Sequence, residues 1–264
     1  MIAGLLLAAA TVCFFVADER VFSYLRENPQ TWYKLRWAEA IKQLGRGYPL
    51  IWLLLAWVGL TGRHRTVIVC LLALLITLAA VTVIKETVRR PRPRDVITAQ
   101  TKGNDAKGIY KSWSFPSGDA ASVFAAGAVL ALAMPWPATV VFAACCCGVA
   151  ILRVVVKAHY PSDVMGGAAT GILSGWAAIL IRNRYPEIEN IFKGRERMLS
   201  FIGIIFIPIL MWLVPCFDKM WRAHSFDEMW RAHSFDDVII LLEFYAPIVL
   251  IIAAADRWGR PKQI

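Results

Sequence analysis

Long apolar blocks alternate with short polar connections along the chain. Eight blocks are candidate membrane spans: 1–17, 48–62, 66–84, 117–134, 138–156, 164–182, 199–216 and 238–255. A helix needs about 20 apolar residues to cross the hydrocarbon layer, and several of these blocks are only slightly shorter. The pattern predicts an all-α fold class, a polytopic transmembrane helical bundle with a six-helix core and two extra C-terminal spans.

The core is expected to cover residues 1–198, and the two additional spans residues 199–264. The first block lacks the positively charged start of a signal peptide, so we interpret it as a retained helix. Aromatic and charged residues mix between the first two blocks, which is typical of an interfacial helix. A nine-residue repeat over 218–235 is interpreted as a duplication tolerated in an exposed connection.

Composition supports a membrane protein rather than a nucleic-acid-binding one. The chain has 264 residues, is 58% hydrophobic and carries a formal net charge of +10. Its basic residues lie in the short connections, where the lipid bilayer and its anionic head groups are the expected partners, with no nucleic acid. The six cysteines lie in or beside apolar blocks without a Cys-x-x-Cys pair, so no metal site is predicted.

Three polar clusters stand at the ends of spans, and strict alternation of the spans puts all three on one side of the membrane. They are KETVRRPRP with Lys85 and Arg92, then Pro116-Ser117-Gly118-Asp119, then RVVVKAHYPSD with Arg153, His159 and Asp163. Each cluster alone has an ordinary structural explanation, as a membrane-boundary anchor or a helix start. Their presence together on one side favours a functional site.

The residue types in these clusters suit phosphate chemistry. Lys85, Arg92 and Arg153 supply fixed positive charge, and the arginines offer forked donors. Ser117 and the Gly118 amide add neutral donors at a helix N-terminus. Groups of this kind stabilise the charge that develops during phosphoryl transfer.

A nucleophile and its partner are also present. His159 can attack phosphorus, and Asp163 can hydrogen-bond one imidazole nitrogen, fixing the tautomer and supporting the cation that forms. These residues together predict a site for phosphoryl transfer.

The three clusters resemble the signature of the type 2 phosphatidic acid phosphatases, relatives of the vanadium haloperoxidases. That signature runs Lys-x6-Arg-Pro, Pro-Ser-Gly-His and Ser-Arg-x5-His-x3-Asp, and the spacings in this chain agree. The resemblance implies an integral membrane phosphatase that hydrolyses a lipid mono- or diphosphate, polyprenyl diphosphate among them. His159 would form a phosphohistidine with Asp163 behind it.

By the same resemblance, the phosphate-binding residues would be Lys85, Arg92, Ser117, Gly118 and Arg153, and the scheme needs neither metal nor cofactor. It implies a cell inner-membrane location with the active site on the extracytoplasmic side. The distribution of Lys and Arg points the other way, since the side that bears the motifs also holds the larger share of them. Charge alone therefore leaves the orientation open.

The sequence departs from the family pattern at two positions. Leu152 stands where the family has Ser, and Asp119 stands where it has the histidine that protonates the departing alcohol. Three explanations for Asp119 are open: the leaving group is itself a phosphate, burial keeps Asp119 protonated so that it serves as the catalytic acid, or His224 or His233 donates the proton.

A non-catalytic membrane protein that binds lipid phosphate is the alternative, and the missing histidine at position 119 is its main support. The retained pair of His159 and Asp163 argues against it, because binding requires cations but not a nucleophile. The identity of the lipid and the oligomeric state do not follow from the sequence.

Overall fold

The computed structural model describes residues 2–28, 30–31, 34–45, 50–51, 53–54, 64–102 and 112–190. Most of the predicted span at 48–62 lies outside the described residues. So do the spans at 199–216 and 238–255, with His224, His233 and the repeat at 218–235.

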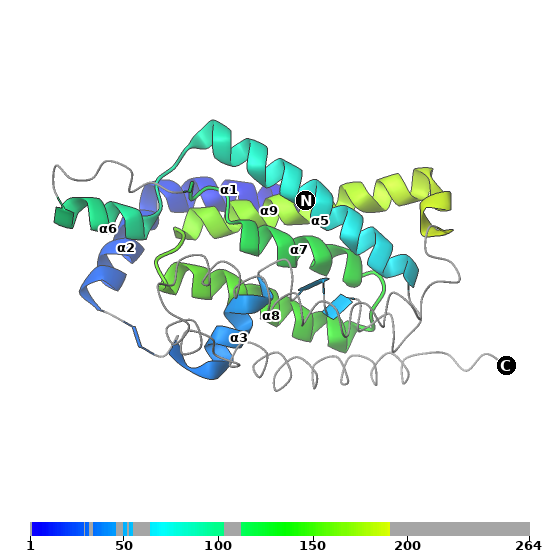
Figure 1. Ribbon diagram of the computed structural model, residues 1–264, viewed down its shortest axis with the longest axis horizontal. Coiled ribbons are helices and arrows are strands. Elements are labelled where there is room, and N and C mark those ends of the chain that lie inside the picture. Colours follow the sequence, from blue (N-terminus) through cyan, green and yellow to red (C-terminus); the bar gives the residue numbers. More distant parts are fainter. Residues whose placement is uncertain are drawn as a thin grey trace, which may run out of the picture.

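The described part of the chain is helical and contains no β-strand, which confirms the predicted all-α fold class (Figure 1). Its helices are α1 (Ile2–Val16), α2 (Asp18–Glu27), α3 (Arg36–Leu44), α5 (His64–Val88), α6 (Pro93–Lys102), α7 (Gly118–Leu130), α8 (Trp136–Val155), α9 (Pro161–Arg184) and the 3-10 helix η3 (Pro186–Asn190).

Several of these helices are suited to a membrane. Three helical segments, which begin in α5, α8 and α9, are long and apolar enough to cross one, and α1 with α2 adds a fourth if that bent pair forms one span. Large apolar side chains such as Leu75, Leu78 and Val83 point out of the bundle and are about two-thirds exposed. An outward surface of this kind is expected to face lipid.

The boundaries of two predicted spans shift in a way that matters for the motifs. The span predicted at 66–84 continues to Val88, so Lys85 lies on the last turn of α5. The helix ends where Arg89 adopts a positive φ of 49°. The span predicted from 164 begins already at Pro161, which places Asp163 in the first turn of α9. The predicted interfacial helix is two short helices, α2 and α3.

The centre of the bundle is a close contact between α7 and α9 (Figure 1). Gly167, Gly171 and Gly175 recur every four residues and face α7, and we call this row the glycine seam. A Cβ at these positions would collide with the backbone carbonyl oxygens of Ser117, Ala121 and Ala125, in that order. Small residues at such a spacing let two helix backbones approach closely.

We expect Gly171→Ala to destabilise the bundle, because the added methyl group meets the Ala121 carbonyl and the two helices must separate. Overpacking of this kind costs about 1–3 kcal/mol, which thermal unfolding in detergent will show as a lower Tm. Gly4→Ala is the matched control, since nothing lies within 4 Å of the corresponding Cβ in α1. Equal melting temperatures for the two variants would contradict the role of the seam.

Candidate active site

The three motifs meet at one end of the bundle, on the left in Figure 1, where α5, α7, α8 and α9 have their motif-bearing ends. Backbone hydrogen bonds join the stretches directly. The Ser117 N–H donates to the Asp163 carbonyl at 2.9 Å, and the Ser114 N–H donates to the Arg90 carbonyl at 2.7 Å. The convergence expected from the sequence is therefore present.

Ser117 begins α7 as its N-cap residue. Its buried hydroxyl oxygen accepts a hydrogen bond from the Ala120 N–H at 3.4 Å. Gly118 is the first residue of the helix, and its backbone N–H is among those that have no partner within the helix. This helix start can present neutral donors to an anion, as the sequence predicts.

His159 lies between α8 and α9 and is almost completely buried. Its Nδ1 atom lies 3.7 Å from Asp163 Oδ2, which is too long for a direct hydrogen bond. Ser114 bridges the gap: its Oγ lies 3.4 Å from His159 Nδ1 and donates a short hydrogen bond to Asp163 Oδ2. The Ser114 oxygen can therefore accept from Nδ1–H, a tautomer that leaves the lone pair on Nε2.

Asp163 is fully buried, and its two carboxylate oxygens are well supplied with donors. Oδ2 accepts from the Tyr160 N–H at 2.8 Å as well as from Ser114. Oδ1 accepts from Arg90 Nη1 at 2.8 Å, so Asp163 also forms an ion pair. These bonds hold the carboxylate in one orientation beside the imidazole.

Asp119 and Arg153 form an ion pair within the site. Arg153 Nε lies 2.6 Å from Asp119 Oδ2, and Arg153 Nη2 donates to the Lys42 carbonyl of α3 at 3.0 Å. The Asp119 side chain is 28% exposed, so burial does not isolate it from solvent. The position where the family has a histidine is thus occupied by a carboxylate held against a cation.

Lys85 and Arg92 supply the remaining positive charge. Lys85 interacts electrostatically with Arg92, Asp119 and Asp163. The Arg92 Nε atom is buried and makes no hydrogen bond to any other described residue. An orphaned buried donor is costly, and a phosphate oxygen would satisfy it.

Three further residues belong to this cluster although they are not among the site residues that the sequence motifs predict. Ser114 lies just before the Pro-Ser-Gly motif, Arg90 lies within the basic run, and Asp18 lies at the start of α2. Nothing in the local spacing distinguishes Arg90 from its neighbour Arg89. The signal that could have indicated Asp18 is an acidic residue directly after an apolar block, which is too common to identify a site.

The environment of His159 favours its neutral form. Burial lowers the pKa of the imidazole below its usual value of 6.5, and the positive charges of Arg92 and Lys85 act in the same direction. The negative charge of Asp163 opposes this shift. A neutral imidazole retains the lone pair that a nucleophile requires.

The helical bundle gathers arginine, lysine and backbone amide donors around a buried His–Asp pair, which is the arrangement that the motifs of a type 2 phosphatidic acid phosphatase predict. Residues 66–187 match the family model of the PAP2 superfamily. The decaprenylphosphoryl-5-phosphoribose phosphatase of Mycobacterium tuberculosis is 33% identical over 149 residues, which is 55% of this chain and 74% of that protein. The chain belongs to the PAP2 superfamily, the family of type 2 phosphatidic acid phosphatases that its motifs resemble.

A second relative shares only part of its length with this chain. The lipid A 1-phosphatase of Rhizobium etli is 42% identical over 80 residues, which is 30% of this chain. The match spans 33% of the length of that relative. No solved structure matches the chain.

The acidic limb of the pH profile of kcat/KM should lie below pH 6.5. A nucleophilic His159 is inactive when protonated, and its lowered pKa delays protonation until the solution is more acidic. The pH dependence of phosphate release from a lipid phosphate measures the limb. A wild-type limb attributable to His159 at or above pH 6.5 would contradict this environment.

Ser114→Ala should lower kcat, because the imidazole loses its bridge to Asp163.

Proposed function

We propose that this protein is a membrane phosphatase that hydrolyses a lipid mono- or diphosphate through a phosphohistidine at His159. The observation that carries the proposal is the bridge from His159 through Ser114 to Asp163, set beside the unsatisfied donor of Arg92. Both relatives are named as phosphatases, one of lipid A and one of a decaprenylphosphoryl sugar, which supports a lipid-linked substrate.

In the first step, the His159 Nε2 lone pair attacks the phosphorus atom and forms a P–N bond. The bond from phosphorus to the lipid oxygen breaks, and that oxygen leaves with the electron pair. Lys85, Arg92 and Arg153 neutralise the charge on the phosphoryl oxygens, and the Ser117–Gly118 helix start adds neutral donors. Asp163, acting through Ser114, stabilises the positive imidazole ring.

In the second step, water attacks the phosphohistidine. The water oxygen bonds to phosphorus, the P–N bond breaks with its electron pair returning to Nε2, and inorganic phosphate leaves with one of the water protons. The other water proton passes to solvent, which balances the proton that an alkoxide product takes up. The lipid product needs one proton when it leaves as an alkoxide, and none when it leaves as a phosphate. The nature of the leaving group therefore determines whether the site requires an acid.

The Asp119–Arg153 ion pair favours a leaving group that departs without being protonated. The Asp119 carboxylate lies in an ion pair with a guanidinium, an arrangement that favours an explanation in which Asp119 is not the acid. Among the three explanations, we favour a lipid diphosphate, because it leaves as a phosphate. We place the protein in the cell inner membrane with this site on the extracytoplasmic side, following the family resemblance.

His159→Ala should abolish phosphate release and the acid-labile, base-stable phosphoenzyme trapped by rapid quenching. The expected loss is at least about 1,000-fold, since removal of a nucleophile leaves only binding and electrostatic stabilisation. His64→Ala is the matched control, because His64 begins α5, at the opposite end of that helix from Lys85. Phosphate release that survives in purified His159→Ala would refute the proposed mechanism.

Wild-type protein should hydrolyse a polyprenyl diphosphate faster than the matching monophosphate. Asp119→His should raise monophosphate turnover, because it restores a group that can protonate an alkoxide, and should change diphosphate turnover less. Asp119→Asn, which releases Arg153 without supplying an acid, is the control. A strong wild-type preference for the monophosphate would exclude the diphosphate assignment.

The absence of the family histidine at position 119 supports the alternative of a lipid-phosphate binder without catalysis. In that case, the purified protein binds vesicles that contain the lipid phosphate but releases no inorganic phosphate. Single-turnover measurements on the same vesicles separate the two functions.

A further inference from the structure

Two buried carboxylates share one guanidinium group behind the proposed nucleophile. Arg90 Nη1 donates to Asp163 Oδ1 at 2.8 Å, and Arg90 Nη2 donates to Asp18 Oδ2 at 2.7 Å. The side chains of Asp18 and Asp163 are 4% and 0% exposed, and that of Arg90 is 16% exposed. The guanidinium also stacks on the Tyr160 ring, with Cζ 3.8 Å from the ring centroid.

Asp18 is fixed by more than the arginine. Its Oδ1 accepts from the Ser162 N–H in the first turn of α9 at 2.9 Å, and its Oδ2 accepts a short hydrogen bond from the Ser162 hydroxyl. Arg90 Nη1 also donates to that hydroxyl oxygen at 2.7 Å. A carboxylate at this position complements the positive end of the α9 dipole. These bonds join Asp18 to Arg90 and Ser162, which lie 72 and 144 positions further along the chain.

We propose that Asp18 and Arg90 form a positioning pair that orients Asp163 and sets how much of its negative charge acts on His159. The inference rests on the proposed function at His159 and adds two residues to it. Among the described residues, neither side chain forms a hydrogen bond or an ion pair with His159, and both act through Asp163.

Charge balance explains why the pair has two members. Arg90 alone would neutralise Asp163, and a neutralised carboxylate gives little support to a positive imidazole. Asp18 takes up part of the guanidinium charge, so the three groups together carry a net charge of −1. That remaining charge is available to the imidazolium or phosphohistidine, while the forked guanidinium fixes the orientation of Asp163.

The charged groups that face His159 come from several elements. Asp163 of α9 stabilises the protonated ring, whereas Lys85 of α5 and Arg92 of the connection before α6 destabilise it. The Asp119–Arg153 pair of α7 and α8 lies next to Arg92. Against this constant background, loss of Asp18 and loss of Arg90 must change the pKa of His159 in opposite directions.

Nuclear magnetic resonance of the full chain in detergent, with labelled histidine, tests this directly. His159→Gln assigns the His159 signal. Asp18→Asn should lower the pKa of His159, and Arg90→Gln should raise it, each on the order of half a pH unit. Arg90→Lys keeps the charge and should leave the pKa close to that of the wild type. Shifts in the same direction, or no shift in either variant, would overturn the proposal.

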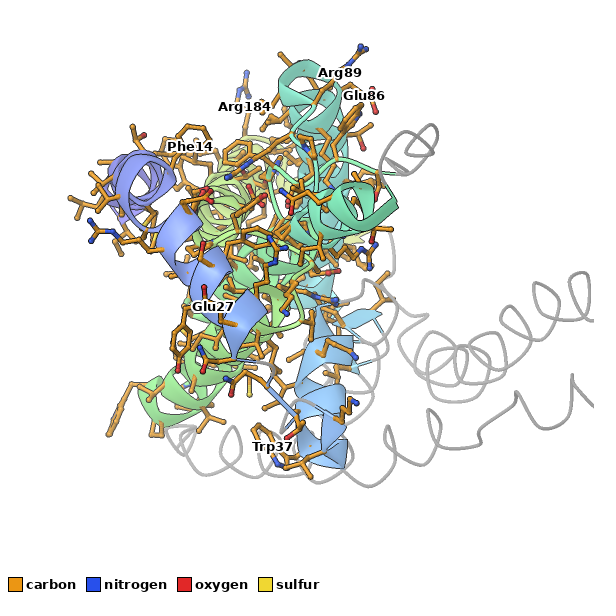
Figure 2. The ribbon with its side chains drawn as sticks, turned by 90° about the vertical axis from the view of Figure 1, so that its left-hand side faces the viewer. Phe14, Glu27, Trp37, Glu86, Arg89 and Arg184 are labelled. Carbon is orange, nitrogen blue, oxygen red and sulfur yellow. The ribbon has the colours of Figure 1, made fainter. Side chains whose placement is uncertain are left out.

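The matched control is the neighbouring surface ion pair of Glu86 and Arg89. Their closest charged atoms lie 4.0 Å apart, and both side chains are more than 60% exposed. Figure 2, which faces this end of the bundle, shows both labelled residues at its outer edge. Glu86→Gln and Arg89→Gln remove the same kinds of charge and should leave the His159 titration unchanged. Shifts as large as those of the buried pair would overturn the proposal.

Catalysis supplies a second readout. Asp18→Asn and Arg90→Lys should each lower kcat by roughly tenfold or more with little change in KM, because neither side chain binds phosphate. An unchanged kcat in both variants would overturn the positioning role.

The titration needs no activity, so the positioning pair and the phosphatase function can fail separately. If Asp18→Asn and Arg90→Gln shift the His159 pKa in opposite directions but the wild-type protein releases no phosphate, the phosphatase function is refuted and this coupling is supported. If Asp18→Asn does not fold, Arg90→Gln and Arg90→Lys decide, since only the former should move the pKa.

Discussion

The buried carboxylate of Asp163 is the interaction on which the rest of the site depends. Burial of an isolated charge is very costly, so the carboxylate must be surrounded by donors. Ser114, Tyr160 and Arg90 supply those donors, and the Asp163 carbonyl accepts from the N–H at the start of α7. One residue thus ties the start of α9 to the two other motif-bearing stretches.

Spacing along the sequence could predict the motifs and their convergence. Lys85, Arg92 and His159 each stand at the end of an apolar block, and alternation of spans places those ends on one side. Local spacing could not reveal Asp18 and Arg90, because their partners lie 72 residues or more away. The bridging Ser114 was missed for a similar reason, since its partners lie 45 and 49 residues along the chain. The helices follow from the apolar pattern, but their exact ends do not, because caps and backbone turns rather than hydrophobicity determine where α5 ends and α9 begins.

Position 119 shows how a departure from a family pattern gains meaning from its surroundings. The sequence shows only that a carboxylate replaces a histidine. The structure adds that this carboxylate lies against Arg153, whose guanidinium also holds the Lys42 carbonyl of α3. The substitution therefore alters the charge available to a phosphate as well as the supply of a proton. Under the proposed function, the phosphate of the substrate competes with Asp119 for Arg153.

The glycine seam has a consequence for how mutations in this protein are interpreted. Gly167 lies one helical turn after Asp163 and faces the carbonyl of Ser117, so the spacing between the two backbones is set beside the proposed nucleophile. A residue without a side chain thereby governs the alignment of the site although it has no reactive group of its own. Genetic screens for lost activity should recover seam glycines alongside the residues with reactive side chains.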